Sequence, residues 1–108
     1  MVYELRTYII PEGRMPEILD RFSAVTFRLF ERHGMAVVGF WTVSKPETDS
    51  ALVYLMRFPD EQSQDRAWEA FRTDPEWKET RERTEADGPI VTEVISKNLQ
   101  PTDFSPLR

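Results

Sequence analysis

The spacing of apolar residues changes several times along this chain, and the order of those changes constrains the fold more than any single motif. Apolar and polar residues alternate over 2–10, and a spacing of three and four residues follows over 14–32. Strand side chains alternate between two faces, whereas helix side chains return to one face every three or four residues. The chain therefore predicts a first strand followed by a long helix.

The later segments continue this succession. Turn residues at 45–49 separate two strand-like segments, and two aspartates stand where helix N-caps are expected. The predicted strands are 36–44, 51–58 and 90–98, and the predicted helical segments begin at Asp60 and at Asp74-Pro75. The order β-α-β-β-α-β is the split βαβ unit, an α+β fold with one antiparallel sheet and its helices on one face.

Composition limits the class of protein. With 108 residues the chain predicts a single domain over 1–108, whose tail at 99–108 packs along the surface. A net charge of −5 argues against nucleic acid as a partner, because phosphates need a basic surface. Without cysteine and with one histidine, His33, we expect no metal site and no cofactor. No targeting segment or long apolar run is visible, so we expect a cytoplasmic protein without membrane insertion.

Two of the predicted strands are too apolar for a sheet with one wet face. Such a sheet should alternate apolar with polar residues, but 35–41 and 51–56 hardly alternate. The predicted helices can cover only one face. A second copy of the same sheet is the simplest cover for the other, since symmetric pairing is the commonest form of oligomer. The sequence therefore predicts a homodimer formed through the sheet face.

The first strand carries a polar row. Glu4, Arg6 and Tyr8 project from one face, while the other face carries Tyr3, Leu5, Thr7 and Ile9. If the apolar row meets the helices, the polar row faces the space enclosed between the two sheets of the dimer. That space then resembles a small-molecule site, which is usually an apolar pocket with a few polar groups.

The next hairpin adds aromatic walls to this predicted cavity. A tight turn centred on Glu47 sets Phe40 opposite Tyr54 and Val38 opposite Met56. The candidate ligand-binding residues are Arg6, Tyr8, Phe40, Tyr54 and Met56. Glu4, Tyr8 and Tyr54 are the candidate catalytic residues, the carboxylate or a tyrosinate acting as base.

Structural explanations compete with each of these assignments. Glu4 and Arg6 could form an ion pair that holds the sheet, and Tyr8 and Tyr54 could be packing residues with a satisfied hydroxyl. The tryptophans are expected as core or interface residues, and the charged run 78–85 as a solvated helix face. Nucleophilic hydrolase and phosphate-loop motifs are absent.

Several segments together resemble one family. They are Tyr3-Glu4-Leu5-Arg6-Thr7-Tyr8, Gly13, His33-Gly34, Val38-Gly39-Phe40-Trp41-Thr42, Val53-Tyr54-Leu55-Met56-Arg57-Phe58, Asp74-Pro75-Glu76-Trp77 and Phe104-Ser105-Pro106-Leu107. In order and spacing they are similar to the NIPSNAP family over essentially the whole chain. The resemblance implies a ferredoxin-like protomer that forms a dimeric α/β barrel. Family members often carry His and Trp where this chain has Tyr54 and Met56.

The resemblance leaves the function open among three classes. The first is a homodimer that binds a small apolar or aromatic metabolite carrying an acidic or carbonyl group, with Arg6 as its anchor. The second is a cofactor-free monooxygenase or isomerase that uses the same pocket. The third is an interaction scaffold whose barrel interior is filled. An empty cavity beside Arg6 favours the first two classes.

Overall fold

A computed structural model describes residues 1–43 and 50–108, and the predicted turn at 45–49 with its centre at Glu47 lies outside them. The elements are β1 (Val2–Ile9), α1 (Met15–Arg21), the π-helical η1 (Phe22–Thr26), α2 (Phe27–Arg32), β2 (Ala36–Thr42), β3 (Ala51–Phe58), α3 (Glu61–Thr73), α4 (Pro75–Thr84) and β4 (Glu93–Leu99). The predicted order of strands and helices is confirmed, with the fourth strand beginning three residues later than expected.

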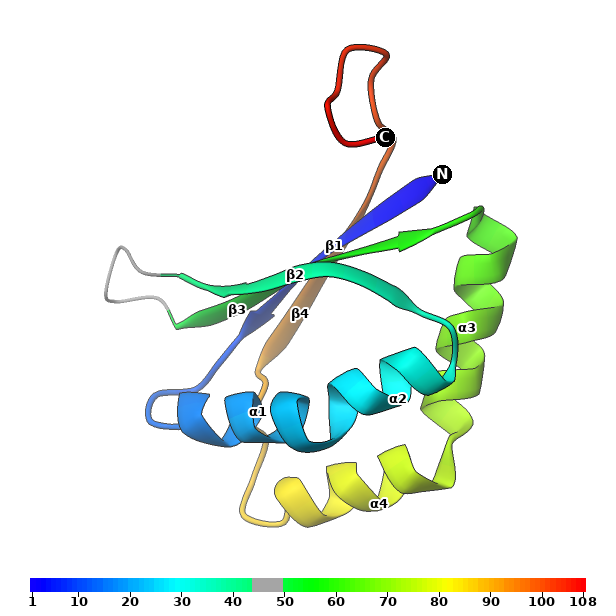
Figure 1. Cartoon of the computed structure of the whole chain (residues 1–108). Coiled ribbons are helices and arrows are strands. Elements are labelled where there is room, and N and C mark those ends of the chain that lie inside the picture. The colour runs from blue at the N-terminus through cyan, green and yellow to red at the C-terminus, as the bar shows by residue number, and fades with distance from the viewer. Residues whose placement is uncertain (44–49) are drawn as a thin grey trace.

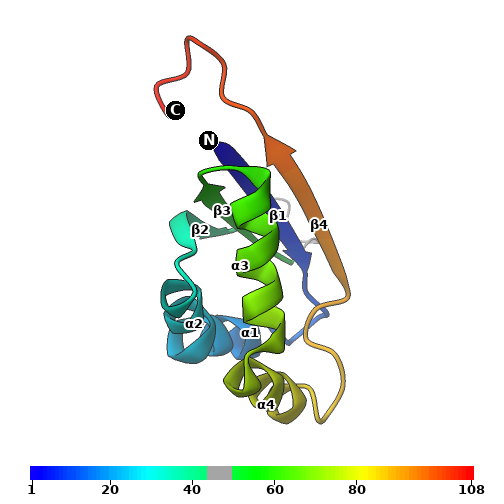
Figure 2. The same cartoon turned by 90° about the vertical axis from the view of Figure 1, so that its right-hand side faces the viewer.

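The strands form one antiparallel sheet in the order β2-β3-β1-β4. Each βαβ pair is split by an intervening strand, so the chain has the predicted ferredoxin-like α+β fold. All helices lie on the same side of the sheet, as both views show (Figures 1 and 2).

The first helical region is continuous but not uniform. η1 interrupts it, and the N–H of Phe27 donates to the carbonyl of Phe22, one residue further back than in an α-helix. Such π segments occur often beside functional sites. The region ends where Gly34 adopts a φ of 70°, the left-handed conformation that glycine tolerates best.

The predicted N-caps are confirmed. Asp60 accepts a hydrogen bond of 2.7 Å from the backbone N–H of Ser63 at the start of α3. Asp74 accepts one of 2.9 Å from the N–H of Glu76 at the start of α4, and its other oxygen lies 2.7 Å from Nε2 of His33. The second cap therefore also ties α4 to the end of α2.

The strand register agrees with the prediction at one position and differs at the next. Phe40 pairs with Tyr54 as expected, but Met56 pairs with Val37 rather than with Val38. The shift lies between Val37 and Gly39, which makes Val38 the additional residue of a β-bulge. An added residue of this kind leaves no signal in the spacing of apolar side chains.

The six predicted site residues share one face of the sheet, but the predicted cover of that face is wrong. Registered pairs join Phe40, Tyr54 and Arg6 across three strands, and Glu4 lies beside Met56. This face meets the helices, because Glu4 bonds to Gln64 and Trp68 of α3. The polar row therefore lies between the sheet and its own helices, not between two sheets.

The helix-facing side of the sheet also carries the core. Phe22 of η1 packs edge-on against Tyr8, Phe40 and Tyr54, with ring centroids 5.4–5.8 Å apart. The fully buried members of this core include Ile18, Leu29, Phe30, Met56 and Ile90. Edge-to-face aromatic contacts of this kind stabilise a core beyond the area that they bury.

The other face of the sheet carries the apolar row of β1. Thr7, Val53, Trp41 and Ile95 pair in one row across all four strands, and Leu5 pairs with Leu55. Trp41 is 52% exposed and Ile95 38%. We call this surface the open face.

The tail that follows β4 lies at one end of the open face. Gln100, Pro101 and Leu107 line a shallow cavity together with Tyr3 and Leu55, while Phe104 is almost fully exposed. Among the residues that the structure describes, no helix is long and apolar enough to cross a membrane.

Candidate functional site

The carboxylate of Glu4 is the centre of a buried hydrogen-bond network. Oε1 accepts bonds of 2.7 Å from both Gln64 Nε2 and Trp68 Nε1. Oε2 accepts 2.8 Å from Arg6 Nη1 and 2.6 Å from Ser96 Oγ. A carboxylate offers about four acceptor positions, so those of Glu4 are filled.

The charges of Glu4 and Arg6 stabilise each other inside the protein. Burial by itself raises the pKa of Glu4, but bonds from Ser96, Arg6, Trp68 and Gln64 outweigh it and lower that pKa. Burial likewise disfavours the Arg6 guanidinium, whereas Tyr54, Tyr8 and Glu4 together raise its pKa. Both groups are therefore ionised at neutral pH, as the predicted ion pair requires.

Arg6 also holds two tyrosines. Its Nε donates 2.8 Å to Tyr54 Oη, and Tyr54 Oη lies 2.8 Å from Tyr8 Oη. Arg6 Nη2 donates a longer bond of 3.4 Å to Tyr8 Oη. The guanidinium stacks on the ring of Trp68 at 4.2 Å, a cation–π contact that fixes its plane.

Tyr54 is the buried member of this group. Its side chain is fully enclosed by the aromatic core, and burial, with the neighbouring Tyr8, raises its pKa well above the ordinary value of 10.0. Tyr54 is therefore a neutral phenol at physiological pH, and a tyrosinate base at this position is disfavoured.

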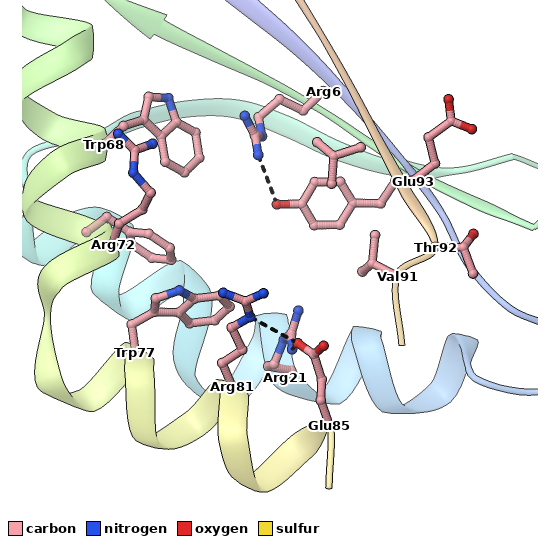
Figure 3. A pocket seen from close by; sticks show the side chains of 13 residues that line it. Arg6, Arg21, Trp68, Arg72, Trp77, Arg81, Glu85, Val91, Thr92 and Glu93 are labelled. Atoms are coloured by element: carbon pink, nitrogen blue, oxygen red, sulfur yellow. Dashed lines mark hydrogen bonds and ion pairs between the residues drawn. The ribbon is translucent and has the colours of Figure 1, made fainter. Parts of the chain in front are cut away.

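A pocket of about 310 Å³ opens beside this network, between the sheet and helices α3 and α4. We call it the sheet–helix pocket. Its lining is Arg6, Tyr8, Arg21, Trp68, Phe71, Arg72, Trp77, Arg81, Glu85 and residues 91–94. Figure 3 shows the labelled side chains arranged around the hollow, with Arg6 on one side and Arg21 and Arg81 on the opposite side.

The pocket combines aromatic walls with positive charge. Four arginines and two glutamates line it, although the whole chain carries a net charge of −5. Trp68, Phe71 and Trp77 are the largest apolar side chains in its lining. A concave, partly aromatic site with excess positive charge is suited to an anionic aromatic ligand.

Arg21 is the most deeply buried arginine of the pocket. It extends from the end of α1 toward the end of α4. Its Nη1 donates hydrogen bonds to Glu85 Oε2 at 3.0 Å and to Thr84 Oγ1 at 3.1 Å. Its guanidinium lies 4.9 Å from the ring centre of Trp77. The side chain is 4% exposed, and its Nε has no hydrogen-bond partner among the described residues.

The structure separates the residues that the sequence grouped together. Arg6 and Tyr8 line the sheet–helix pocket. Tyr54 and Met56 do not line it, because both are fully buried in the core. Phe40 lines a different, apolar groove of about 370 Å³ between β2 and the first helical region. We call it the edge groove, and its other lining residues are Leu19, Phe22, Ser23, Phe27, Val37, Val38, Gly39 and Leu52.

Several lining residues were missed at the level of sequence. Trp68 and Trp77 were expected only as core or interface residues, and 78–85 only as a solvated face. A signal existed, because Trp77, Arg81 and Glu85 recur every four residues and so share one side of α4 and its C-cap. Residues 1–43 and 50–108 hold no group of three or more His, Asp or Glu arranged to bind a metal ion.

Solved structures give the fold an independent comparison. A protein of Agrobacterium tumefaciens is 22% identical, with a TM-score of 0.87 and 100% of both chains covered. An uncharacterized NIPSNAP domain protein from Burkholderia xenovorans is 25% identical, with a TM-score of 0.84, covering 98% of this chain and 99% of that one. A cofactor-independent oxygenase from Streptomyces nogalater is 14% identical, with a TM-score of 0.60, covering 97% and 96%. At such low identity the first and third likenesses show the fold alone.

The family is shown by the sequence itself. The search of curated proteins found no match. The NIPSNAP family profile, in contrast, matches residues 3–106, nearly the entire chain, and the predicted resemblance is confirmed. The chain belongs to the NIPSNAP family.

Proposed function

We propose that this protein binds a small aromatic metabolite with an acidic or carbonyl group in the sheet–helix pocket. The observation that carries the proposal is a cavity of about 310 Å³ whose lining joins two tryptophans to four arginines. Arg6 and Tyr8 keep the ligand-binding role expected from the sequence. Tyr54 and Glu4 support them from behind, and Phe40 and Met56 contribute through the core.

The first alternative is an enzyme of the cofactor-free oxygenase or isomerase type. The shared fold with the Streptomyces nogalater oxygenase supports it. Such chemistry begins with a base that removes a proton from the substrate. Glu4 has its acceptor positions filled and Tyr54 is held neutral, so neither is prepared for that task. Tyr8 is the one catalytic candidate that lines the pocket, and binding, which needs no base, is the better supported function.

The second alternative is a scaffold with a filled interior. The sheet–helix pocket argues against it, because a scaffold has no need to keep a cavity beside a stacked arginine. A concave site lined by aromatic side chains and a few polar groups is commonly a binding site.

We further propose that two copies pair through the open face. Its apolar rows contain Leu5, Val53, Leu55, Trp41 and Ile95. Contiguous exposed apolar surface of this kind marks an interaction site. The pocket lies on the opposite side of the sheet, so each protomer would keep its own complete site.

The test is a thermal-shift screen of aromatic acids and aromatic ketones. Val94 lines the sheet–helix pocket opposite Tyr8, and Val38 lines the edge groove. Val94→Trp should fill the former and abolish every ligand-induced shift, whereas Val38→Trp should leave the shifts unchanged. If Val38→Trp abolishes them and Val94→Trp does not, the edge groove is the binding site and the proposal is wrong.

A further inference from the structure

We infer that the sheet–helix pocket selects an aromatic acid that carries a hydrogen-bond acceptor, such as a ketone oxygen, at the end remote from its acid group. Tyr8 would donate to the acceptor, and Arg72 and Arg81 would hold the acid. This inference rests on the proposed function and specifies the ligand class and its orientation.

The direction of the hydrogen bonds begins at Arg6. A guanidinium has only donors, so the bond of 2.8 Å from Arg6 Nε must be accepted by Tyr54 Oη. The guanidinium in turn is locked by Glu4 at 2.8 Å and by stacking on Trp68. In the bond between Arg6 and Tyr54, Arg6 is therefore always the donor and Tyr54 always the acceptor.

The proton of Tyr54 has a single destination. Tyr54 is fully buried, and its hydroxyl contacts only Arg6 Nε and Tyr8 Oη among the described residues. Leaving a buried hydroxyl proton unpaired costs free energy, so Tyr54 donates its proton to Tyr8. The separation of 2.8 Å is ordinary for such a bond.

Tyr8 is then left with one function. Its oxygen accepts from Tyr54 and, over 3.4 Å, from Arg6 Nη2, which occupies both lone pairs. Its own proton has no acceptor in the network, and Tyr8 lines the pocket. Tyr8 can therefore donate to a ligand but cannot accept from one.

The acid group is assigned to the outer side of the pocket by charge and exposure. Arg6 and Arg21 already have close carboxylate partners at 2.8 and 3.0 Å. Arg72 and Arg81 are paired only loosely, at 3.5 and 3.6 Å, and their side chains are 60% and 67% exposed. They project from α3 and α4 into one pocket, where they can close on a carboxylate from two sides.

Two ligands of matched shape separate these contributions. para-Acetylbenzoate carries a ketone oxygen where para-isopropylbenzoate carries a methyl group. Only para-acetylbenzoate can therefore accept a hydrogen bond from Tyr8. Isothermal titration calorimetry measures both against the wild type, Tyr8→Phe and the double variant Arg72→Gln with Arg81→Gln. Tyr3→Phe, on the other face of β1, is the control for Tyr8→Phe. Arg66→Gln, on α3 outside the pocket, is the control for the two arginine substitutions.

The wild type should bind the ketone about fivefold more tightly than its isostere, the usual size of one neutral hydrogen bond. Tyr8→Phe should remove that preference while leaving the isostere unaffected. The double arginine variant should weaken both ligands about fivefold. Tyr3→Phe and Arg66→Gln should change neither affinity. Thermal melting of each variant verifies that it is folded.

The outcomes distinguish the inference from the proposed function. If both ligands bind equally, or if the preference survives in Tyr8→Phe, the donor role of Tyr8 is overturned while the pocket stands. If the double arginine variant binds both as tightly as the wild type, the orientation is overturned. If neither ligand binds the wild type, the pocket does not take aromatic acids, and inference and proposed function fall together.

Discussion

The indole Nε1 of Trp68 donates a hydrogen bond of 2.7 Å to the Glu4 carboxylate, and together with the bond from Gln64 it joins the first strand to α3. It turns the polar row of β1 toward the helices and places Arg6 against the Trp68 ring. The same contact leaves the apolar row of β1 on the open face. The location of the pocket and the surface proposed for dimerisation thus follow from the way Glu4 and Arg6 contact α3.

Replacing Glu4 should strongly destabilise the fold. Glu4→Gln keeps the shape of the side chain but leaves the buried Arg6 without its counter-charge. Breaking a buried pair from one side costs about 3 kcal/mol or more. Urea denaturation should show this loss, and Asp65→Asn, on the exposed surface of α3, is the control. A loss below about 0.5 kcal/mol would mean that the network contributes little to stability.

Acid should weaken the protein partly through the same carboxylate. The folded state lowers the pKa of Glu4 below its ordinary value of 4.5, so the folded chain binds that proton less readily than the unfolded chain. Its contribution is therefore complete above pH 4.5 and is lost as the pH falls through the folded pKa. Unfolding free energies measured from pH 7 to 3 should fall less steeply in Glu4→Gln than in the wild type. Parallel profiles would assign the acid sensitivity to other carboxylates.

The two N-cap aspartates should differ in their importance. Asp60 caps α3 with one bond to Ser63, whereas Asp74 caps α4 and also contacts His33 and Arg32. Replacing a cap by alanine costs about 1 kcal/mol. Asp60→Ala should lose about that amount in thermal or urea unfolding, and Asp74→Ala measurably more. An equal loss would show that the contacts to α2 add nothing.

Charges placed at adjacent positions of β3 should have different effects. Leu55 faces the open side, while Met56 is fully buried beneath the helices. Leu55→Asp should therefore lower the sedimentation mass from dimer to monomer. Met56→Asp should unfold the chain whatever its oligomeric state, because a buried unpaired charge is costly. A wild-type protein that sediments as a compact monomer at micromolar concentration would contradict the proposed dimer.

Much of the fold followed from periodicity and helix caps. The changes of spacing located the strands and the long first helix, and Asp60 and Asp74 marked the helix starts. The bulge at Val38 was missed because one added residue does not alter the composition of β2. The π-helical turn at Phe22–Thr26 was missed because it does not alter the composition of the first helical region either.

The site was harder to predict than the fold. Alternation in β1 separated the polar row from the apolar row but could not tell which one meets the helices. Apolar residues were assigned to the helix side, yet Gln64 and Trp68 supply the donors that let a carboxylate be buried there. Arg21, Arg72 and Arg81 come from three different helices, and only the tertiary structure brings them together.

The central claim is that ligands bind between the sheet and the helices, and the tryptophans can report it directly. Trp68 and Trp77 line the sheet–helix pocket, whereas Trp41 lies on the open face. In a heteronuclear NMR titration with para-acetylbenzoate, the indole signals of Trp68 and Trp77 should shift and saturate together. The Trp41 signal should stay in place. A saturable shift of Trp41 alone, or no shift of any indole signal, would contradict the claim.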